Sequence, residues 1–298
     1  MIGLDEATNK ELAQVICTLE AKFKLADLLR VLPISPDTFF YWKHQFKLPN
    51  KDYHLRYLIS RIWSQDHHMG VLRITQALLN DFNLKVNHKR VYRLMKELDI
   101  QGEGYRKKIR KYDSSKGPEG TRVKNKLRRR FQTDRPNQKM VSDVTEFKIP
   151  ETQERVYFEP IMDLYNNEIL TFAITAGSPN LEFAMKPLDS LIDLIPNQPY
   201  KQFLHTDQGW QYRHRAWQKK LRNAHITPSM SRRATCLDNA CIESFFNKLK
   251  VELGNLSNYN SAEELIAAIK KWIIYYNTER IQMKLSGTSP IKYRLRAA

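Results

Sequence analysis

The chain changes its hydrophobic pattern at Met140, from helical periodicity to short strand-like runs. Three such runs follow one another, "MVSDVTEFKI", "RVYFEPIMDLY" and "EILTFAITA", with an Asn-Asn turn signal between the last two. Their hairpin spacing predicts an antiparallel meander. A helix over 181–195, kinked or broken at Pro187, and a buried strand over 201–206 then imply a crossover and a mixed sheet. With helices expected from about 211 to the end, the predicted fold class is an α/β sheet with helices packed on it.

The first part of the chain is helical. Residues 8–33 repeat apolar side chains every three or four positions, which predicts one helix. Pro33 and Pro36 end this pattern, and Ser35 is a suitable N-cap for a helix over 36–45. A helix, a short break and a second helix form a helix-turn-helix-like arrangement.

A second pair of helices is predicted over 70–82 and 88–98, with Asn87 as the N-cap of the latter. One side of that helix is apolar, and the other carries basic side chains. The apolar stripe consists of Val91, Leu94, Met95 and Leu98, and the basic side includes Lys89, Arg90 and Arg93. A basic helix face is as often a solvated surface as a DNA contact, but the charge of the whole chain favours DNA.

That charge is strongly positive. Lys and Arg number 49 against 32 acids, a net charge of +17, which indicates a polyanionic partner. Residues 105–139 hold 14 of these cations against 3 acids, around a Ser- and Gly-containing middle, and predict a basic linker that contacts nucleic acid. Part of this linker is expected to be helical, around 121–131. A solvated charge run is the competing interpretation.

No apolar stretch approaches the roughly 18–20 residues that span a bilayer, and the N-terminus lacks the features of a signal peptide. Nucleic acid is therefore favoured over a membrane surface, and we expect a cytoplasmic, nucleoid-associated protein. Cys17, Cys236 and Cys241 are too few and too scattered for a disulfide framework. A zinc site that combines His67 and His68 with distant cysteines matches no zinc spacing.

Three carboxylates stand out by position. Asp143 lies within the first strand-like run, Asp207 follows the strand over 201–206, and Glu243 lies in a helix for which Asp238 or Asn239 is a suitable N-cap. Clustered carboxylates repel one another unless cations hold them. Two Mg²⁺ ions suit this role and the cleavage of phosphodiesters, and Mn²⁺ is an expected substitute. Each acid taken singly is more often a surface residue or a cap.

The helix that carries Glu243 has a core side and a neighbouring polar side. The expected core stripe is Ile242, Phe246, Leu249 and Leu253. Glu243, Asn247 and Lys250 share the neighbouring side, so Lys250 is placed to meet a phosphate backbone if Glu243 faces a metal ion. Glu146 lies three residues beyond Asp143, on the opposite strand face, and is left out of the set.

The sequence around these acids resembles the orfB product of insertion-sequence transposases of the IS-three group. The matching segments are "SDVTEF", "HTDQGWQY", "SMSRRATCLDNACIESFFNKLKVE" and "WIIYYNTERIQMKLSGTSPIKYR", in that order. Thirty-five residues separate Asp207 from Glu243, the spacing of the acidic triad in retroviral-integrase-like enzymes. Thr206, Ala234 and Thr235 depart from the residues common in the family, but no carboxylate is lost.

The resemblance implies an RNase H-like core, a mixed five-stranded sheet with flanking helices, in which Asp143, Asp207 and Glu243 bind metal. It also implies a set of supporting residues, of which His205 and Tyr212 are equally suited to packing. The supporting residues are His205, Gln208, Tyr212, Asp238, Asn239 and Asn247. The cations expected to contact DNA are Lys250, Arg232, Arg233, Lys89, Arg90, Arg93, Arg128, Arg129 and Arg130.

Five segments are predicted. They are a helix-turn-helix-like segment over 1–50, a second such domain over 51–104, the basic linker over 105–138, the catalytic core over 139–262, and a C-terminal helix and tail over 263–298. No sustained heptad occurs, so we expect the zipper and terminal-repeat-recognition domain of the family's orfA product to be absent. The orfA product, or a frameshift fusion with it, is an expected partner.

The predicted function is Mg²⁺-dependent DNA nicking at element ends followed by strand transfer from the freed 3′-hydroxyl. The resemblance implies a copy-out, paste-in route, DNA terminal repeats and target DNA as substrates, and a homo-oligomer on DNA. A non-catalytic DNA-binding regulator or domesticated relative is the main alternative, and a nuclease of the same fold acting on branched or hybrid nucleic acid is another.

Overall fold

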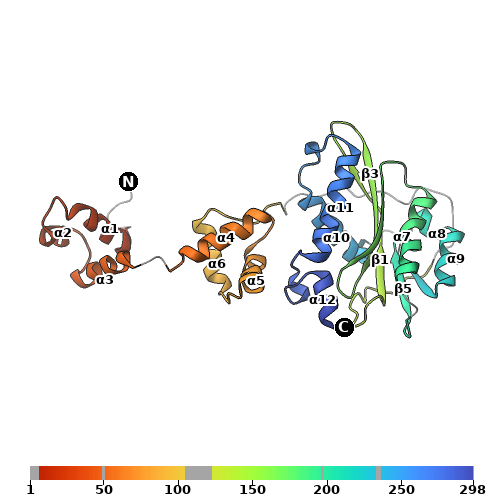
Figure 1. The fold of residues 1–298 in the computed structure, drawn as a ribbon, viewed down its shortest axis with the longest axis horizontal. Helices are drawn as coiled ribbons and strands as arrows, with labels where there is room; N and C mark the ends of the chain where they lie inside the picture. The colour runs from red at the N-terminus through yellow and green to blue at the C-terminus, as the bar shows by residue number, and fades with distance from the viewer. Residues whose placement is uncertain (1–6, 49–50, 105–122, 196–197, 233–235, 298) are drawn as a thin grey trace. The chain divides into compact units, whose positions relative to one another are not determined.

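The computed structural model describes residues 7–48, 51–104, 123–195, 198–232 and 236–297 (Figure 1). The chain divides into two compact units, Met1–Leu58 and Ile59–Ala298, and each is described by itself. Within the described residues, no helix has the length and apolar character needed to cross a membrane.

The first unit contains α1 (Asn9–Leu19), α2 (Leu25–Val31) and α3 (Pro36–Lys47). Ser35 caps α3 and Pro36 occupies its first turn, as the sequence predicts. The single helix expected over 8–33 is wrong, because the chain turns between α1 and α2. The turn returns Leu25 and Leu28 to the cluster formed by α1 and α3, which one straight helix would carry them past. Tertiary packing therefore overrides a continuous helical pattern.

The next helices are α4 (Tyr53–Gln65), α5 (Val71–Phe82) and α6 (His88–Glu97). The predicted pair matches α5 and α6. Asn87 caps α6 by accepting a hydrogen bond from the Lys89 backbone amide at 2.8 Å. Val91, Leu94 and Met95 are buried, while the basic residues of α6 are exposed. The apolar side of α6 thus packs inward, and its cations face solvent.

The second unit is built around one mixed sheet. Its strands are β1 (Lys139–Ser142), β2 (Thr145–Lys148), β3 (Arg155–Asp163), β4 (Ile169–Thr175), β5 (Gln202–Thr206) and β6 (Ile226–Met230). β1 and β2 both pair antiparallel with β3, end to end along one edge, and β4 pairs with its other edge. β5 is parallel to β1, and β6 is parallel to β5. The six strands therefore occupy five positions, which agrees with the predicted five-stranded mixed sheet and its meander.

The segment after β5 differs from the prediction of helices from about 211 onward. The short α8 (Trp210–Arg213) and α9 (Arg215–Asn223) are followed by the strand β6. β6 contains Pro228, which pairs with Leu204 at the end of the sheet. A proline lacks a backbone donor and is tolerated in an edge strand, so its presence in the sequence concealed the strand.

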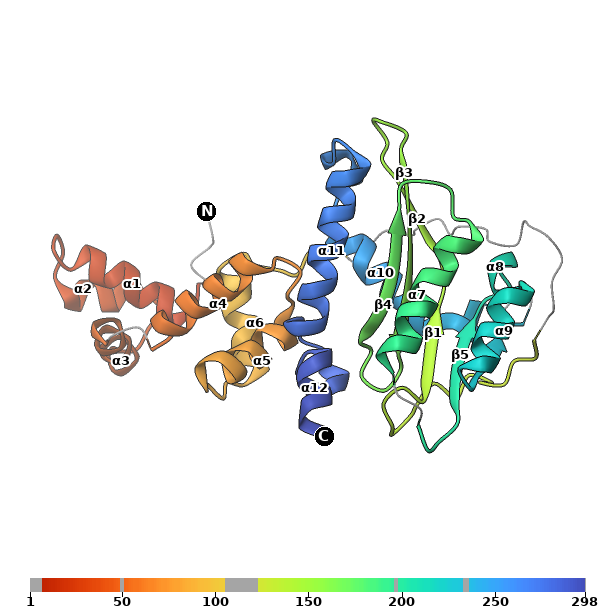
Figure 2. The same ribbon diagram turned by 45° about the vertical axis from the view of Figure 1, so that its right-hand side comes forward.

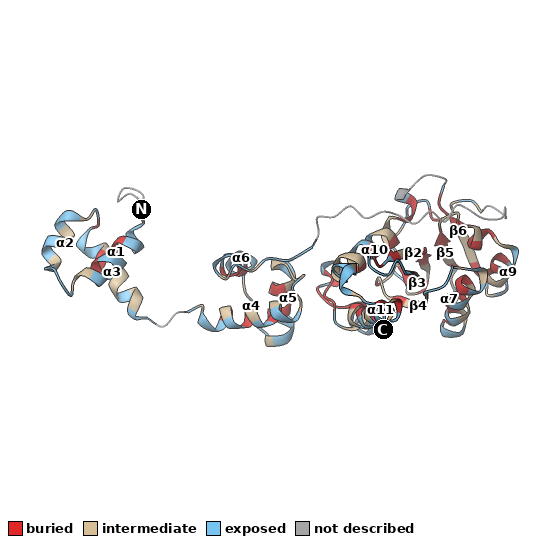
Figure 3. Cartoon of the chain, turned by 90° about the horizontal axis from the view of Figure 1, so that it is seen from above, coloured by how far each residue is buried: buried red, intermediate tan, exposed pale blue. Residues whose placement is uncertain are grey.

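Helices cover both faces of the sheet (Figures 1 and 2). α10 (Ala240–Glu252) and α11 (Ala262–Thr278) bury their apolar sides on one face, and α7 (Leu181–Leu194) and α9 cover the other. α7 remains one helix through Pro187, whose carbonyl oxygen accepts a hydrogen bond from the Thr171 hydroxyl. α12 (Pro290–Ala297) follows near the C-terminus. Figure 3 shows buried residues concentrated in the strands and on the helix sides that face them.

The described part of the basic linker, residues 123–138, contains no helix, so the helix expected around 121–131 is wrong for 123–131. Residues 121 and 122 lie outside the described residues. Leu127 is 3% exposed, and the backbone amides of Lys126 and Leu127 both donate to the Ser229 hydroxyl oxygen on β6, at 2.9 and 3.1 Å. Because these amides bond to the sheet edge, and Arg128 and Arg129 turn the chain with positive φ angles, a bent, non-helical path replaces the expected helix.

Candidate active site

Asp143 and Asp207 lie beside each other because of strand register. β1 and β5 are parallel neighbours, with Met140 opposite Leu204 and Val141 opposite His205. Each acid directly follows its strand, and the same register offset places Asp143 opposite Asp207. Adjacent strands lie about 4.8 Å apart. The sequence thus folds two acids onto neighbouring positions at the carboxyl end of a parallel strand pair, where sites in α/β sheets form.

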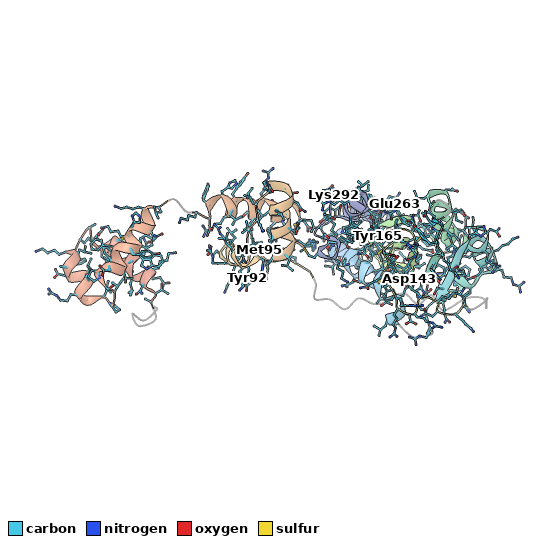
Figure 4. The ribbon with its side chains drawn as sticks, turned by 90° about the horizontal axis from the view of Figure 1, so that it is seen from below. Tyr92, Met95, Asp143, Tyr165, Glu263 and Lys292 are labelled. Atoms are coloured by element: carbon cyan, nitrogen blue, oxygen red, sulfur yellow. The ribbon has the colours of Figure 1, made fainter. Side chains whose placement is uncertain are left out.

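Asp143 is 4% exposed, and its Oδ1 accepts a hydrogen bond from the Val144 backbone amide at 2.9 Å. Oδ1 of Asp207 accepts one from the Gly209 amide at 2.8 Å. Figure 4 labels Asp143 among the packed side chains of this domain. Both carboxylates raise the pKa of the nearby Glu159 carboxyl, after the larger effect of its burial. The three acids therefore share one electrostatic environment.

Glu243 lies on the first turn of α10, which packs on the sheet. Ile242, Phe246 and Leu249 are buried against the strands, which confirms these members of the predicted core stripe, and Phe245 joins them. The Asn239 side-chain amide donates to the Ser142 carbonyl oxygen at 3.4 Å, between the start of α10 and the residue before Asp143. Asn239 occupies the N-cap position but makes no capping side-chain bond.

The three carboxylates do not form a closed ligand set in this conformation. Among the described residues, no group of three or more His, Cys, Asp or Glu side chains is arranged to hold a metal ion. The structure therefore brings Asp143 and Asp207 together by register, and places Glu243 on the adjacent helix.

Lys250 lies farther along α10, on the side of the acids. Its Nζ is 5.3 Å from the centre of the Phe147 ring. Burial lowers the pKa of Lys250 to about 8, while Glu146 and Asp143 act in the opposite direction. Glu146 itself accepts a hydrogen bond from Arg155 on β3 at 2.8 Å. Asn247, the remaining residue of the predicted polar side, is exposed.

His205 is fully buried beneath this region and bonds to two serines. Its Nδ1 is 2.9 Å from the Ser229 hydroxyl oxygen, and its Nε2 is 3.1 Å from that of Ser231. Burial lowers the pKa of His205 to about 4, so the ring is neutral at pH 7. Ser229 already accepts two backbone amides, so its hydroxyl donates to Nδ1 and the ring proton resides on Nε2.

Among the other expected supporting residues, Gln208 donates to the Ser231 carbonyl oxygen at 2.9 Å. Tyr212 is fully buried, with its ring centre 5.2 Å from that of Trp217. These positions give His205 and Tyr212 internal packing roles, one of the two interpretations that the sequence left open.

Comparison with known proteins identifies the family of the chain. An integrase core domain family matches residues 133–236, a second integrase core domain family matches 224–290, and an HTH-like domain family matches 50–108. A putative transposase, InsK, for insertion sequence element IS150 of Escherichia coli (strain K12) is 35% identical over 94% of this chain and 97% of that protein. The chain belongs to the insertion-sequence transposases of the IS-three group.

The chain is also similar to other known proteins. An uncharacterized transposase-like protein of Haemophilus influenzae is 41% identical over 71% of the transposase and 94% of that protein. The HTLV-2 integrase catalytic core domain, solved in complex with magnesium, has a TM-score of 0.41 and 18% identity over 53% of this chain and 96% of that one. The integrase core match confirms the predicted RNase H-like fold and places the transposase among polynucleotidyl transferases. Its HTH-like and integrase domains imply DNA binding.

Asp238 organises the cations that precede α10 of the transposase. Its side chain is fully buried and accepts hydrogen bonds from Arg129 Nε at 2.8 Å, Arg232 Nε at 2.9 Å and Asn125 Nδ2 at 2.9 Å. Arg129 and Arg232, two of the expected DNA contacts, are thus also partners of a buried acid. Their side chains remain 44% and 61% exposed, which leaves room for a second partner.

The remaining expected DNA contacts lie on the surface. Lys89, Arg90 and Arg93 are exposed on α6, where Arg93 also pairs with Glu97 at 2.5 Å. Arg128 and Arg130 are exposed in the linker, and Arg233 lies outside the described residues. Their exposed side chains are accessible to a polyanion.

Glu159 is the residue of this site that sequence reasoning missed. It is 1% exposed in the middle of β3, and burial raises the pKa of its carboxyl well above the ordinary value. With Val144, Asn180 and Gln211 it lines a small cavity. The signal was present in "VYFEPIM", the apolar part of this run, which Glu159 interrupts.

Proposed function

We propose that this transposase nicks DNA at the ends of its element and joins the freed 3′-hydroxyl to target DNA. The observation that carries the proposal is the register that sets Asp143 beside Asp207 at the ends of two parallel strands, in a chain of the transposase family. Two neighbouring carboxylates repel each other, and hard divalent cations relieve that repulsion while binding phosphate oxygens.

The proposed ligands are Asp143, Asp207 and Glu243, all oxygen donors of the kind that Mg²⁺ prefers. Two bound Mg²⁺ ions, with Mn²⁺ as a substitute, would activate the attacking oxygen and stabilise the leaving oxygen. Glu243 has to approach the two aspartates when DNA binds, through a shift of the first turn of α10. Asp143 and Asp207 hold their orientation through the backbone amides of Val144 and Gly209.

The proposed substrates are the terminal inverted repeats of the element and a target duplex. Phosphates are attracted by the exposed cations of α6 and of the linker, and by Lys250 beside the acids. Two DNA ends have to meet for transfer, so the active form is proposed to be a homo-oligomer on DNA, with an orfA product or frameshift fusion as a further partner. We therefore also propose that the protein acts at the nucleoid of a bacterial cell.

The test compares Asp143→Asn with Glu146→Gln. Both changes remove one charge from the same extended segment and preserve side-chain size, but only Asp143 belongs to the proposed ligand set. Asp143→Asn should lower Mg²⁺-dependent nicking of a labelled element end by about 10³-fold or more, equal to roughly 4 kcal/mol. Glu146→Gln should stay within about threefold of the parent. Binding of the DNA end, measured by gel shift, should persist in both variants.

Full nicking activity in Asp143→Asn would refute the proposed ligand set. A parent protein that binds the ends tightly in Mg²⁺ and never nicks them would instead support the DNA-binding regulator. Nicking that is indifferent to the terminal repeat sequence would indicate a nuclease of the same fold.

A further inference from the structure

Residues on and just before α5 form hydrogen bonds with α11 and with the segment that follows it. Asp66, just beyond α4, accepts a hydrogen bond at 2.6 Å from the hydroxyl of Tyr275 on α11. Asn80 on α5 donates from Nδ2 to the carbonyl oxygen of Gly287 at 2.9 Å. Gly287 has φ +71°, and a Cβ at this position would collide with the Gln76 side chain. The two segments therefore approach each other closely, backbone included.

Arg73 joins acids from both segments. Its Nη2 is 2.8 Å from Oδ2 of Asp66, and its Nη1 is 3.7 Å from Oε1 of Glu252. The side chains of Arg73 and Asp66 are 12% exposed and that of Glu252 is 3% exposed. Such shielded charges are stable only when they are paired, because each loses its hydration on burial. This contact is therefore a specific arrangement of charges and differs from a loose surface pair.

Glu252 is fixed from the catalytic side as well. Arg280 Nη2 lies 2.5 Å from its Oε1, and Trp272 Nε1 donates to its Oε2 at 3.1 Å. Glu252 is the last residue of α10, the helix whose first turn carries Glu243. The contact with α5 thus reaches the far end of the helix that supplies the proposed third metal ligand.

We propose that Asp66, Arg73, Gln76 and Asn80 form a docking face by which the HTH-like domain binds the catalytic domain of its own chain. A consequence, which rests on the proposed function, is that Arg73 acts as a positioning residue for α10 and Glu243. The basic residues of α6 are exposed and lie outside this face, so docking and DNA contact use different surfaces.

The test measures hydrogen exchange of the full chain without DNA or metal. Arg73→Met keeps the side-chain length and removes the charge that joins Asp66 to Glu252. Exchange of the backbone amides in α5 and in residues 283–289 should become about tenfold faster in this variant. Glu252→Gln should also speed exchange of these amides. Because both substitutions remove the same Arg73–Glu252 contact, exchange in the double variant should be less than about twofold faster than in the faster single variant.

Arg222→Met, an exposed arginine on α9, is the matched control and should leave exchange in both segments unchanged. Tyr275→Phe removes only one hydroxyl and serves if Arg73→Met does not fold. Unchanged protection of both segments in folded Arg73→Met and Tyr275→Phe would overturn the docking face. Protection that falls on dilution, together with a dimer in sedimentation, would assign the contact to a second copy and would overturn docking within one chain.

A nicking assay tests the positioning role separately. Arg73→Met should lower kcat for nicking about tenfold while the Kd for an element end stays within about twofold, because α10 moves and α6 does not change. An unchanged kcat in a variant with increased exchange would refute the positioning role. If the parent does not nick DNA at all, the proposed function fails, and the exchange measurement still decides whether the docking face exists.

Discussion

Replacement of Asp238 by asparagine tests how the cations before α10 are held. Asp238→Asn preserves the size of a fully buried side chain and removes its charge. The carboxylate accepts five hydrogen bonds, three to Oδ2 from Asn125, the Arg232 amide and Arg232 Nε, and two to Oδ1 from Arg129 and Arg232 Nη2. An asparagine has an NH₂ group in place of one of the two carboxylate oxygens. That group cannot accept hydrogen bonds, so the bonds to one of the two oxygens are lost.

The magnitude follows from those bonds. A hydrogen bond to a charged group contributes about 1.5–3 kcal/mol to stability. The loss is smaller here, because the side chains of Arg129 and Arg232 are about half exposed and bind water again when they are released. We therefore expect the free energy of unfolding to fall by about 2–3 kcal/mol, less than the 3–5 kcal/mol for breaking a wholly buried pair. Hydrogen bonds from Arg232 hold the folded-state pKa of Asp238 well below its ordinary value of 3.8. Its stabilisation is thus present above about pH 4 and is lost as the pH falls further.

The assay is urea unfolding of the full chain at pH 7 and at pH 3, with Arg130→Met as the control. Arg130 is an exposed linker arginine, and the hydrogen bonds of Asp238 described above go to Asn125, Arg129 and Arg232 instead. The variant and the parent should differ by about 2–3 kcal/mol at pH 7 and by less at pH 3. A difference below about 0.5 kcal/mol at pH 7, or one that grows on acidification, would refute the reasoning.

Two further changes test the interior of the site. Glu159→Gln replaces the buried acid by a neutral amide. Above about pH 4.5 the parent should lose stability relative to this variant, by about 1.4 kcal/mol per pH unit, until the pH reaches the raised pKa of Glu159 in the folded state. A stability difference in urea unfolding that does not change with pH would contradict the burial of a neutral acid. Ser229→Ala should lower the free energy of unfolding by about 1–3 kcal/mol, because the backbone amides of Lys126 and Leu127 and Nδ1 of His205 lose their hydrogen-bond partner. Thermal melts that match those of the parent would show instead that water replaces the hydroxyl.

The sequence predicts most of the sheet because its patterns are local. Alternation and hairpin spacing identify β3 and β4, and the strand–helix–strand order implies that β5 lies parallel to an earlier strand. The proximity of Asp143 and Asp207 follows from that parallel pairing, since each acid directly follows its strand. The third carboxylate, Glu243, comes from a helix, and the resemblance to a known family assigns it to the same set as the two aspartates, which strand pairing alone does not do.

Other features depend on tertiary contacts that no local pattern reveals. The non-helical path of residues 123–131 is selected by bonds to Ser229 and Asp238, more than 100 positions away in the chain. β6 is an edge strand whose proline argues against a strand until its place in the sheet is known. Glu159 carries an ionisable side chain into the core, and its pKa depends on burial and on Tyr212, Asp143 and Asp207, which are distant from it in the sequence.

The two ends of α10 explain why charge, as well as apolar packing, fixes the helix that carries Glu243. The buried stripe of Ile242, Phe245 and Leu249 determines which side of the helix faces the sheet, but apolar contacts are not directional and tolerate small shifts along the helix axis. Directional bonds act just before its first turn, through Asp238, and at its last residue, Glu252. Asp238 bonds to Arg129 of the basic linker, and Glu252 pairs with Arg73 of the HTH-like domain. A displacement of the basic linker or of the HTH-like domain would therefore act on the position of Glu243 through one end of the same helix.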